Sequence, residues 1–387
     1  MAQLRVAGAV AITMRRLPLV LMALLALPAV AQARPGGPDG GFGGGRGFVR
    51  DLVLPGGISV TAALVLGNGR FAMFGGDYGS TLALFDRGGR RLAVTMRPTT
   101  GNDEHIVEAG TAVVASSEKG PDGLQLLRYS RRGKLVPGWG TGGVLTLPNG
   151  EALLAGHPSG AVTISRRRRG GTLLVERLTA SGARDRTFRA RRLRGAETLI
   201  RMPDDGIVAT SDRGRGRIHR LSRTGRVIWS RSPPRALVYG PERLVADARG
   251  GVVALGGDRS SRIVAVRLRG DGRVDRSWGR RGMARAPKGL FDLGTVRFDS
   301  RGRLLLPGVI EARGAGVARL RADGEPDRRF GRRGLTELPS GSQDASIAYD
   351  ARAIGSRILV AGQSLEGDPS GGAFGNPGKA LLARLRG

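Results

Sequence analysis

The chain has 387 residues, of which 40% are apolar, and 63 basic against 32 acidic residues give it a formal net charge of +31. This apolar content excludes a disordered chain, and the absence of Cys excludes a disulfide scaffold. Only four of the basic residues are Lys, at positions 119, 134, 288 and 379. Nucleic-acid binders usually mix Lys with Arg, so the charge indicates nonspecific association and predicts no specific nucleic-acid partner.

The N-terminal residues read as a secretory signal peptide. Met14-Arg15-Arg16 is positively charged, residues 17–30 (LPLVLMALLALPAV) are apolar, and Ala31-Gln32-Ala33 is a small-x-small cleavage site. The apolar stretch is shorter than the roughly 20 residues that span a bilayer, although an uncleaved membrane anchor remains the alternative. We therefore expect a signal peptide over residues 1–33, cleavage near Ala33, and a protein that is secreted or held in the cell envelope.

One sequence pattern recurs along the rest of the chain. It is clearest in residues 317–338 (VARLRADGEPDRRFGRRGLTEL), and residues 266–286 and 126–147 repeat it. Each copy predicts a strand, a tight turn and a second strand, and an apolar strand that begins near Gly precedes it, as at 302–308 (GRLLLPG). The central apolar residue recurs about every 50 positions, at Phe85, Tyr129, Leu178, Leu221, Leu268, Leu320 and Leu385.

A Gly stands four residues after each of the first six central residues, where it can supply the positive φ of a tight hairpin. These residues are Gly89, Gly133, Gly182, Gly225, Gly272 and Gly324. An aromatic residue follows in four copies, at Trp139, Phe188, Trp278 and Phe330. We expect these rings to be buried where one repeat packs on the next, rather than to bind a ligand.

The two ends of the chain carry complementary halves of the repeat. Residues 380–386 (ALLARLR) are a first half, and residues 42–49 (FGGGRGFV) resemble the second half that begins at Phe330. Seven first halves and seven second halves, offset by half a unit, predict a closed ring. Short strands and Gly-rich turns favour an all-β fold. We therefore predict a seven-bladed β-propeller over residues 42–387, closed by pairing of the N- and C-terminal strands, after a short Gly/Pro-rich linker over 34–41.

The pattern Arg-Leu-x-x-x-Gly-x-x-Asp-x-x-Phe-Gly-x-x-Gly resembles the delta-60 repeat family of bacterial proteins. The match is clearest at residues 319–334 and 267–282, and residues 177–188 keep the Asp and the aromatic residue without the final Gly-x-x-Gly. The resemblance covers about residues 42–387 and implies a β-propeller-like fold in exported proteins. It implies no defined activity, cofactor or catalytic residue.

The sequence offers few residues for catalysis or metal binding. The three His, at His105, His157 and His219, stand in different repeats, and no His or Cys pair has the spacing of a transition-metal site. The polar run 101–105 (GNDEH) is compatible with Ca²⁺ binding or an acid–base pair, but a solvated turn is the simpler interpretation. No nucleophile elbow and no P-loop occurs. We predict no catalytic residue, no cofactor and no metal.

Loops between the second and third strands of each blade should share one face of the propeller, and long or irregular loops on a rigid scaffold tend to carry function. Two blades place Gly-Gly-Asp there, and the third and fourth place runs of Arg. The candidate ligand face comprises Arg166, Arg167, Arg168, Arg169, Arg213, Arg215, Arg217, Asp77 and Asp258. Guanidinium groups gathered in this way suit phosphate or sulfate. The alternative is a solvated surface whose Arg residues pair locally with Asp204, Asp205 and Asp212.

These observations favour a secreted β-propeller that acts as a binding or scaffold module without evident catalytic chemistry. One alternative is a propeller hydrolase or lactonase with carboxylates around the central channel. Another is a polyanion-binding protein of the cell envelope. An enzyme should direct several Asp, Glu or His into one end of the channel, whereas a scaffold should have apolar or Arg-lined walls. The expected partner is an anionic polymer of the envelope or another protein, and we expect a monomer.

Overall fold

The computed structural model of the protein describes residues 34–387 apart from ten short stretches. The stretches outside the description are 53–59, 77–78, 99–102, 119–122, 149–151, 168–171, 195–197, 212–215, 339–344 and 366–378. Residues 1–33, over which a signal peptide is predicted, also lie outside the described residues. Arg34–Gly387 form one compact unit.

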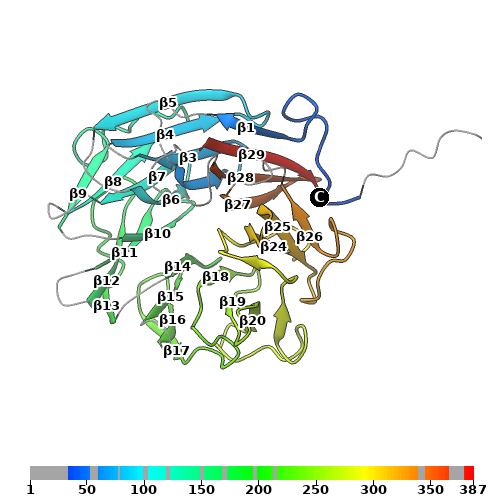
Figure 1. Ribbon diagram of the computed structural model, residues 1–387. Helices are drawn as coiled ribbons and strands as arrows, with labels where there is room; N and C mark the ends of the chain where they lie inside the picture. Colours follow the sequence, from blue (N-terminus) through cyan, green and yellow to red (C-terminus); the bar gives the residue numbers. More distant parts are fainter. Residues whose placement is uncertain are drawn as a thin grey trace, which may run out of the picture. The chain divides into compact units, whose positions relative to one another are not determined.

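Seven antiparallel sheets and no helix are present among the described residues (Figure 1). In the first six sheets, called blades one to six, the strands pair in chain order, except that the first two strands of blade six both pair with its third strand. Blade one contains β2 (Val60–Val65), β3 (Phe71–Gly75), β4 (Gly79–Phe85) and β5 (Arg91–Pro98). Blade two contains β6 (Asp103–Ala109), β7 (Ala112–Glu118), β8 (Leu124–Tyr129) and β9 (Val144–Leu147). Blade three contains β10 (Ala152–Gly156), β11 (Val162–Arg167), β12 (Thr172–Leu178) and β13 (Arg191–Arg194).

The remaining blades follow the same plan, with two departures. Blade four contains β14 (Leu199–Arg201), β15 (Ile207–Ser211), β16 (Arg217–Leu221) and β17 (Val227–Arg231). Blade five contains β18 (Arg243–Ala246), β19 (Val252–Gly257), β20 (Ile263–Leu268) and β21 (Met283–Arg285). Blade six splits its first position between two short strands and contains β22 (Leu290–Phe291), β23 (Arg297–Phe298), β24 (Leu304–Ile310), β25 (Gly314–Leu320) and β26 (Leu335–Glu337). Blade seven takes its outer strand from the start of the chain and contains β27 (Ala345–Ile354), β28 (Arg357–Leu365), β29 (Lys379–Arg386) and β1 (Phe48–Leu52).

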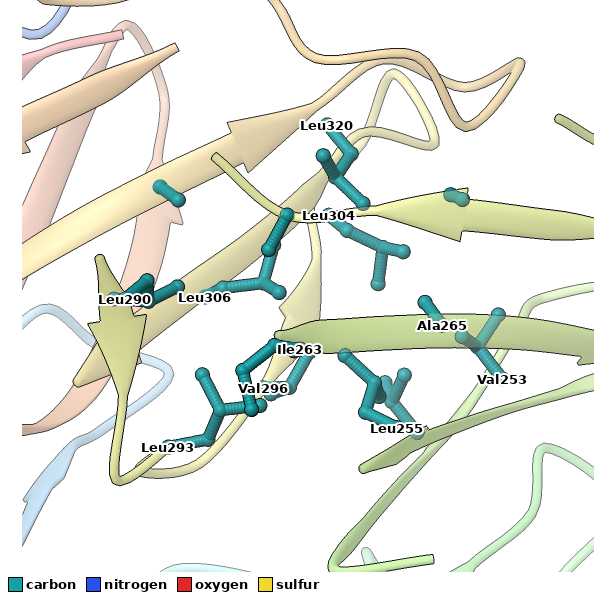
Figure 2. Close-up of a cluster of buried hydrophobic side chains, with 14 of the residues drawn as sticks. Val253, Leu255, Ile263, Ala265, Leu290, Leu293, Val296, Leu304, Leu306 and Leu320 are labelled. Atoms are coloured by element: carbon teal, nitrogen blue, oxygen red, sulfur yellow. The ribbon is translucent and has the colours of Figure 1, made fainter. Parts of the chain in front are cut away.

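The first strand of each blade lies on the inner side of the ring, beside the first strands of its neighbours. β2 contacts β6, β6 contacts β10, β10 contacts β14, β14 contacts β18, and β27 contacts β2. Between blades five and six the joint is a cluster of buried aliphatic side chains, in which Leu255 and Ile263 pack with Leu304 and Leu306 (Figure 2). The fold is therefore a seven-bladed β-propeller in which each sheet buries its apolar face against the next, as the repeats predict.

β1 closes the ring by pairing with the C-terminal strand. Phe48 lies opposite Ala383, and Leu52 lies opposite Ala380, in an antiparallel ladder. The blue β1 and the red β29 accordingly lie side by side in Figure 1. This pairing confirms the predicted closure. It gives blade seven its fourth strand and leaves β29 with a hydrogen-bonded neighbour on each side, so that no open edge remains there.

Residues 34–41 were predicted to form a linker, but most of this segment belongs to blade seven. The Gly36 amide donates to the Arg386 carbonyl at 2.7 Å, and the Arg386 amide donates to the Gly37 carbonyl at 3.0 Å. The Asp39 amide extends the pairing by donating to a carbonyl of β29 at 2.9 Å. Residues paired in this way are fixed in the sheet and do not link it to anything.

The sequence of this segment explains its position. Residues 36–42 (GGPDGGF) share their Gly, Pro, Asp and Phe with residues 324–330 (GEPDRRF), which form the turn of blade six. Gly36 has the same left-handed backbone as Gly324, with φ of +87° and +90°. The start of the chain therefore supplies both the turn and the outer strand that the C-terminal half repeat lacks.

The glycines and aromatic residues of the repeat have the predicted roles. The six turn glycines all have positive φ, between +77° and +90°. A Cβ on Gly182 would lie 3.2 Å from the ring of Trp139, and one on Gly324 would lie 2.8 Å from the ring of Trp278. The four aromatic residues, Trp139, Phe188, Trp278 and Phe330, are at most 3% exposed. In both of these cases the buried ring of one blade packs beneath the turn of the next, which is a structural role.

An arginine beside the central apolar residue covers the aromatic ring in four of the blades. The guanidinium carbon lies 4.3–5.3 Å from the ring centroid in Arg128–Trp139, Arg177–Phe188, Arg319–Phe330 and Arg384–Phe42. Cation–π attraction and hydrogen bonds to a neighbouring blade, such as Arg128 Nη1 to the Gly160 carbonyl at 2.8 Å, offset the cost of burying the charge. Part of the high arginine content is therefore structural.

Candidate functional site

Arg166, the first residue of the predicted ligand face, is buried in blade three. It is 7% exposed, its Nε donates to Glu176 Oε1 at 2.5 Å, and its Nη1 donates to the Pro148 carbonyl at 2.9 Å. The register of β11 on β12 pairs Ile164 with Glu176 and Arg166 with Leu174. Arg166 and Glu176 are therefore diagonal neighbours on one face of the sheet, where opposite charges attract. Arg166, a candidate for the ligand face, is therefore already paired within its own sheet.

Arg217 and Asp258 make contacts within their own blades. Arg217 is exposed, and it donates from Nε to Ser230 Oγ at 2.6 Å and from Nη2 to the Ser230 carbonyl at 2.8 Å. Asp258 accepts from the amides of Ser260 and Arg262 at 2.9 and 3.2 Å, which caps its own turn. Of the other candidates, Arg167 is the last residue of β11, and Asp77, Arg168, Arg169, Arg213 and Arg215 lie outside the described residues. The described candidates thus occupy three different blades.

Asp204 and Asp205 lie in the turn between β14 and β15, at the opposite end of blade four from the predicted ligand face, and they pair with other arginines. Asp204 accepts from Arg220 Nη2 at 2.5 Å, and Asp205 accepts from Arg201 Nη1 at 3.2 Å. Asp212 lies outside the described residues. These carboxylates are therefore engaged by arginines of β14 and β16 rather than by the predicted ligand-face residues.

The joint between blades three and four holds a buried histidine. His157 is 2% exposed, its Nδ1 lies 3.3 Å from Asp205 Oδ1, and its Nε2 lies 2.8 Å from Thr163 Oγ1. Burial, followed by the charge of Arg177, lowers the pKa of His157 to about 4 although Asp205 opposes the shift. The order of Asp, His and hydroxyl resembles a nucleophilic triad, but Thr163 is 0% exposed, so no substrate reaches it. This network stabilises the joint.

Two carboxylates on inner strands are relevant to the alternative that the protein is an enzyme with carboxylates around its central channel. Asp350 in β27 is 0% exposed and accepts from Arg297 Nε and from the Val65 amide, both at 2.7 Å. Glu108 in β6 accepts from Arg352 Nη1 at 2.8 Å. Each acid accepts a hydrogen bond from an arginine of another blade, which joins the blades.

The described residues contain no group of three or more His, Cys, Asp or Glu that could hold a metal ion. Residues 103–105 of the polar run begin the inner strand β6, so this part of the run is not the turn that the sequence suggested. Within the same described ranges, no helix is long and apolar enough to cross a membrane.

A cavity of about 820 Å³ opens where blade six meets the ring-closing segment. Pro35 and Gly387 form part of its wall, and most of the remainder comes from blade six. Half of its twelve lining residues are arginine, namely Arg301, Arg303, Arg319, Arg321, Arg328 and Arg329. Only two lining side chains, Glu325 and Asp327, carry a negative charge. We call this feature the arginine-lined cavity.

The turn of blade six brings these arginines together. The Gly324 amide donates to the Arg321 carbonyl at 2.9 Å, and the Asp327 amide donates to the Arg319 carbonyl at 2.9 Å. This folds residues 328–329 back beside the end of β25. The turn that precedes β24 supplies the other two arginines, because the Asp299 carboxylate caps it by accepting from two of its amides.

Arg319 is the most buried arginine of the cavity. It is 1% exposed, its Nε donates to Asp327 Oδ2 at 2.8 Å, and its guanidinium lies 4.3 Å from the centroid of Phe330. Its Nη1 is buried and has no hydrogen-bond partner in the described part of the chain. Burial, and then the charge of Arg303, hold the pKa of Arg319 below its usual value, although Asp327 opposes the shift. The charge of Arg319 is therefore only partly compensated.

The outer arginines of the cavity are more accessible to solvent than Arg319. Arg301, Arg328 and Arg329 are exposed, and none of their side chains makes an ion pair or hydrogen bond with another described residue. Arg321 pairs with Asp323 at 2.7 Å, but both side chains are more than half exposed, so solvent weakens this pair. The arginine-lined cavity thus combines a buried, incompletely paired guanidinium with a rim of free positive charge.

No sequence motif singles out these residues, although blade six carries a signal. It holds two Arg-x-Arg pairs, at 301–303 and 319–321, and an Arg-Arg pair at 328–329. The three pairs meet only once the turns are folded.

No protein-family model matches the chain, and no curated protein matches it. Among solved structures, a protein of unknown function from Bacteroides caccae is 12% identical, with a TM-score of 0.42 over 73% of this chain and 100% of that one. Two structures of puromycin hydrolase, one of them a mutant complexed with PGG, are 14% and 15% identical, with TM-scores of 0.47 and 0.46. Each of these two matches covers 84% of this chain and 55% of the hydrolase chain.

Proposed function

We propose that the protein is a β-propeller binding module that captures an anionic ligand in the arginine-lined cavity. The observation that supports this most strongly is the gathering of six arginines around one cavity whose lining has only two acidic side chains. The excess of guanidinium groups over carboxylates around it sets the sign of the ligand.

Phosphate and sulfate groups have the chemistry that such a cavity selects. A guanidinium group presents parallel N–H donors that match two oxygens of a phosphate or sulfate, and it stays charged at every physiological pH. The cavity volume of about 820 Å³ is in the range of sites that enclose whole small molecules. The ligand is therefore an anion with several such groups, or the end of a polymer, rather than a single ion.

Export would place this cavity beside polymers of the required charge. We propose that residues 1–33 act as a signal peptide and that the protein works outside the cytoplasm, where anionic polymers of the cell envelope carry phosphate or sulfate groups. The resemblance to the delta-60 repeat family supports this location. In this proposal the protein binds its ligand and does not transform it.

Calorimetric titration with inorganic tripolyphosphate, and separately with a sulfated heparin tetrasaccharide, tests the proposal. The Arg321→Ser/Arg328→Ser variant removes two charges from the cavity, and we expect binding weaker by about tenfold or more. The Arg269→Ser/Arg276→Ser variant is the matched control, because it removes the same two charges from the corresponding exposed positions of blade five.

Measuring the affinity over a series of salt concentrations distinguishes binding at a site from binding to the diffuse charge of the protein. The affinity of the wild-type protein should fall with salt, since binding releases counterions, and the slope should decrease in the cavity variant but not in the control. Equal weakening by both variants, with equal salt slopes, would show that only the diffuse charge of the protein binds the anion. If tripolyphosphate and the tetrasaccharide both fail to bind the wild-type protein at low salt, the proposal is wrong.

A further inference from the structure

The segment that closes the ring is also a wall of the arginine-lined cavity. Pro35 lines the cavity, and its carbonyl accepts from the Gly331 amide of blade six at 2.8 Å. The next residue, Gly36, pairs with Arg386 at the end of β29. The cavity therefore lies at the seam where the two ends of the folded unit meet, and it has all its walls only when the segment 35–42, which we call the closing segment, is docked.

The closing segment is held by contacts that lie outside the cavity. Asp39 is 6% exposed, and its Oδ2 lies 2.6 Å from both Arg357 Nε and Arg384 Nε. Phe42 is 1% exposed, stacks under Arg384, and lies 6.2 Å from the ring of Phe71 in blade one. Neither Asp39 nor Phe42 lines the cavity. Docking can therefore be perturbed without removing a residue that faces the ligand.

We infer that anion binding in the arginine-lined cavity is coupled to docking of the closing segment, so that the ligand stabilises the closed ring. The inference rests on the proposed function and adds its regulation. A ligand shifts a conformational equilibrium only by its difference in affinity for the two states. Here the difference arises because undocking removes the Pro35 wall from the cavity.

Thermodynamic linkage makes the effect reciprocal. If bound anion favours docking, then weakening the docking contacts must lower the affinity for the anion in proportion to the docked fraction that is lost. Electrostatics without coupling predicts the opposite change in affinity for the Asp39→Asn variant. Asp39→Asn removes a negative charge, so without coupling it leaves the affinity for an anion unchanged or slightly raises it. Coupling predicts weaker binding.

Hydrogen exchange on the wild-type protein is the first arm of the test. The amides of Gly36 and Asp39 donate to carbonyls of β29, at 2.7 and 2.9 Å, and exchange when the closing segment undocks. At saturating tripolyphosphate we expect their exchange to slow by about tenfold, the size of a typical coupling. The Gly272 amide, which donates to the Arg269 carbonyl in the corresponding turn of blade five at 2.8 Å, should not change.

Titration of Asp39→Asn with tripolyphosphate is the second arm, and Asp275→Asn is its matched control. Asp275 has the position in the repeat of blade five that Asp39 has in blade seven, and it lies outside the cavity. We expect several-fold weaker binding by Asp39→Asn and unchanged or slightly tighter binding by Asp275→Asn.

The outcomes distinguish this inference from the function on which it rests. If wild-type protein binds tripolyphosphate but exchange at Gly36 and Asp39 stays the same, the cavity binds anions and the coupling is wrong. Binding by Asp39→Asn as tight as that of the wild-type protein, although its Gly36 amide exchanges faster, also overturns the coupling. Absence of any binding by the wild-type protein overturns the proposed function, and the coupling with it.

Discussion

Arg357 and Asp39 are 318 positions apart in the chain, yet Arg357 Nε donates a hydrogen bond to Asp39 Oδ2 at 2.6 Å. Blade six has the same arrangement within one repeat, where Arg303 lies 4.0 Å from Asp327 and Arg319 lies 2.8 Å from it. The last repeat of the ring is thus assembled from both ends of the chain. Ring closure depends on this ion pair as well as on the backbone ladder of β1.

Acid should weaken the closure through Asp39. Burial would raise the pKa of Asp39, but the Gly41 amide, Arg384 and Arg357 together hold it below the ordinary value of 3.8. A carboxyl group with a lowered pKa adds stability above its unfolded pKa, and this is lost as the pH falls through the folded pKa. We expect wild-type protein to be more stable than Asp39→Asn at pH 6 and the difference to vanish well below pH 3.8. Thermal unfolding of both proteins across this range measures the difference; a gap that persists at the lowest pH would contradict it.

His157 should also make the stability of the protein depend on pH, over a pH range above that of Asp39. The pKa of His157 is about 4 in the folded protein against 6.5 when unperturbed, so between these values the unfolded chain binds a proton that the folded protein does not. Stability should therefore fall on acidification from pH 6.5 to 4, by about 3 kcal/mol in all. Denaturant unfolding of wild type and His157→Gln isolates this contribution. Parallel pH profiles for the two proteins would show that His157 is not buried neutral.

Replacing Phe330 by Ala should destabilise the protein by about 3–5 kcal/mol, as for other large buried aromatic residues. The ring is 0% exposed and also supports the guanidinium of Arg319. Phe291→Ala is the control, since Phe291 is 42% exposed and its loss should cost less than about 1 kcal/mol. Chemical denaturation provides both values, and a loss below about 1 kcal/mol for Phe330→Ala would place that ring at the surface.

Gly324→Ala should destabilise the protein by about 2–5 kcal/mol, because a methyl group there meets two obstacles. The backbone has φ of +90°, and the new Cβ would lie 2.8 Å from the ring of Trp278. Gly355→Ala meets only the first obstacle, with φ of +58° and no atom within 4 Å of the new Cβ. We expect that variant to lose about 1–2 kcal/mol. Equal losses would show that blade packing at Gly324 contributes nothing.

The fold could be predicted because its determinants recur in the sequence. Each of the first six repeats has a Gly at its turn, and each repeat has a central apolar residue on a strand. The two half repeats at the ends of the chain imply that the ring is closed. The segment 34–41 was misread as a linker for a local reason. Gly40 and Gly41 replace the Arg-Arg pair of blade six, so the segment has the composition of a flexible linker although it keeps the Pro, Asp and Phe of the turn.

The candidate site could not be predicted, because pairing across strands decides which arginines are free. Arg166 stands in a run of four arginines and looks exposed in sequence, yet the strand register places Glu176 against it. Arg328 has an Asp beside it in sequence and looks paired, yet Asp327 bonds to Arg319 instead. Only the folded ring shows where positive charge is left without a partner.

Mapping the reactivity of arginines tests the central claim most directly. Phenylglyoxal modifies accessible arginines, and mass spectrometry reports the extent at each position with and without saturating tripolyphosphate. We expect the ligand to protect Arg301, Arg321 and Arg328 and to leave Arg269 and Arg276 of blade five reactive. Equal protection of the arginines of both blades, or no protection at the cavity despite measured binding, would contradict it.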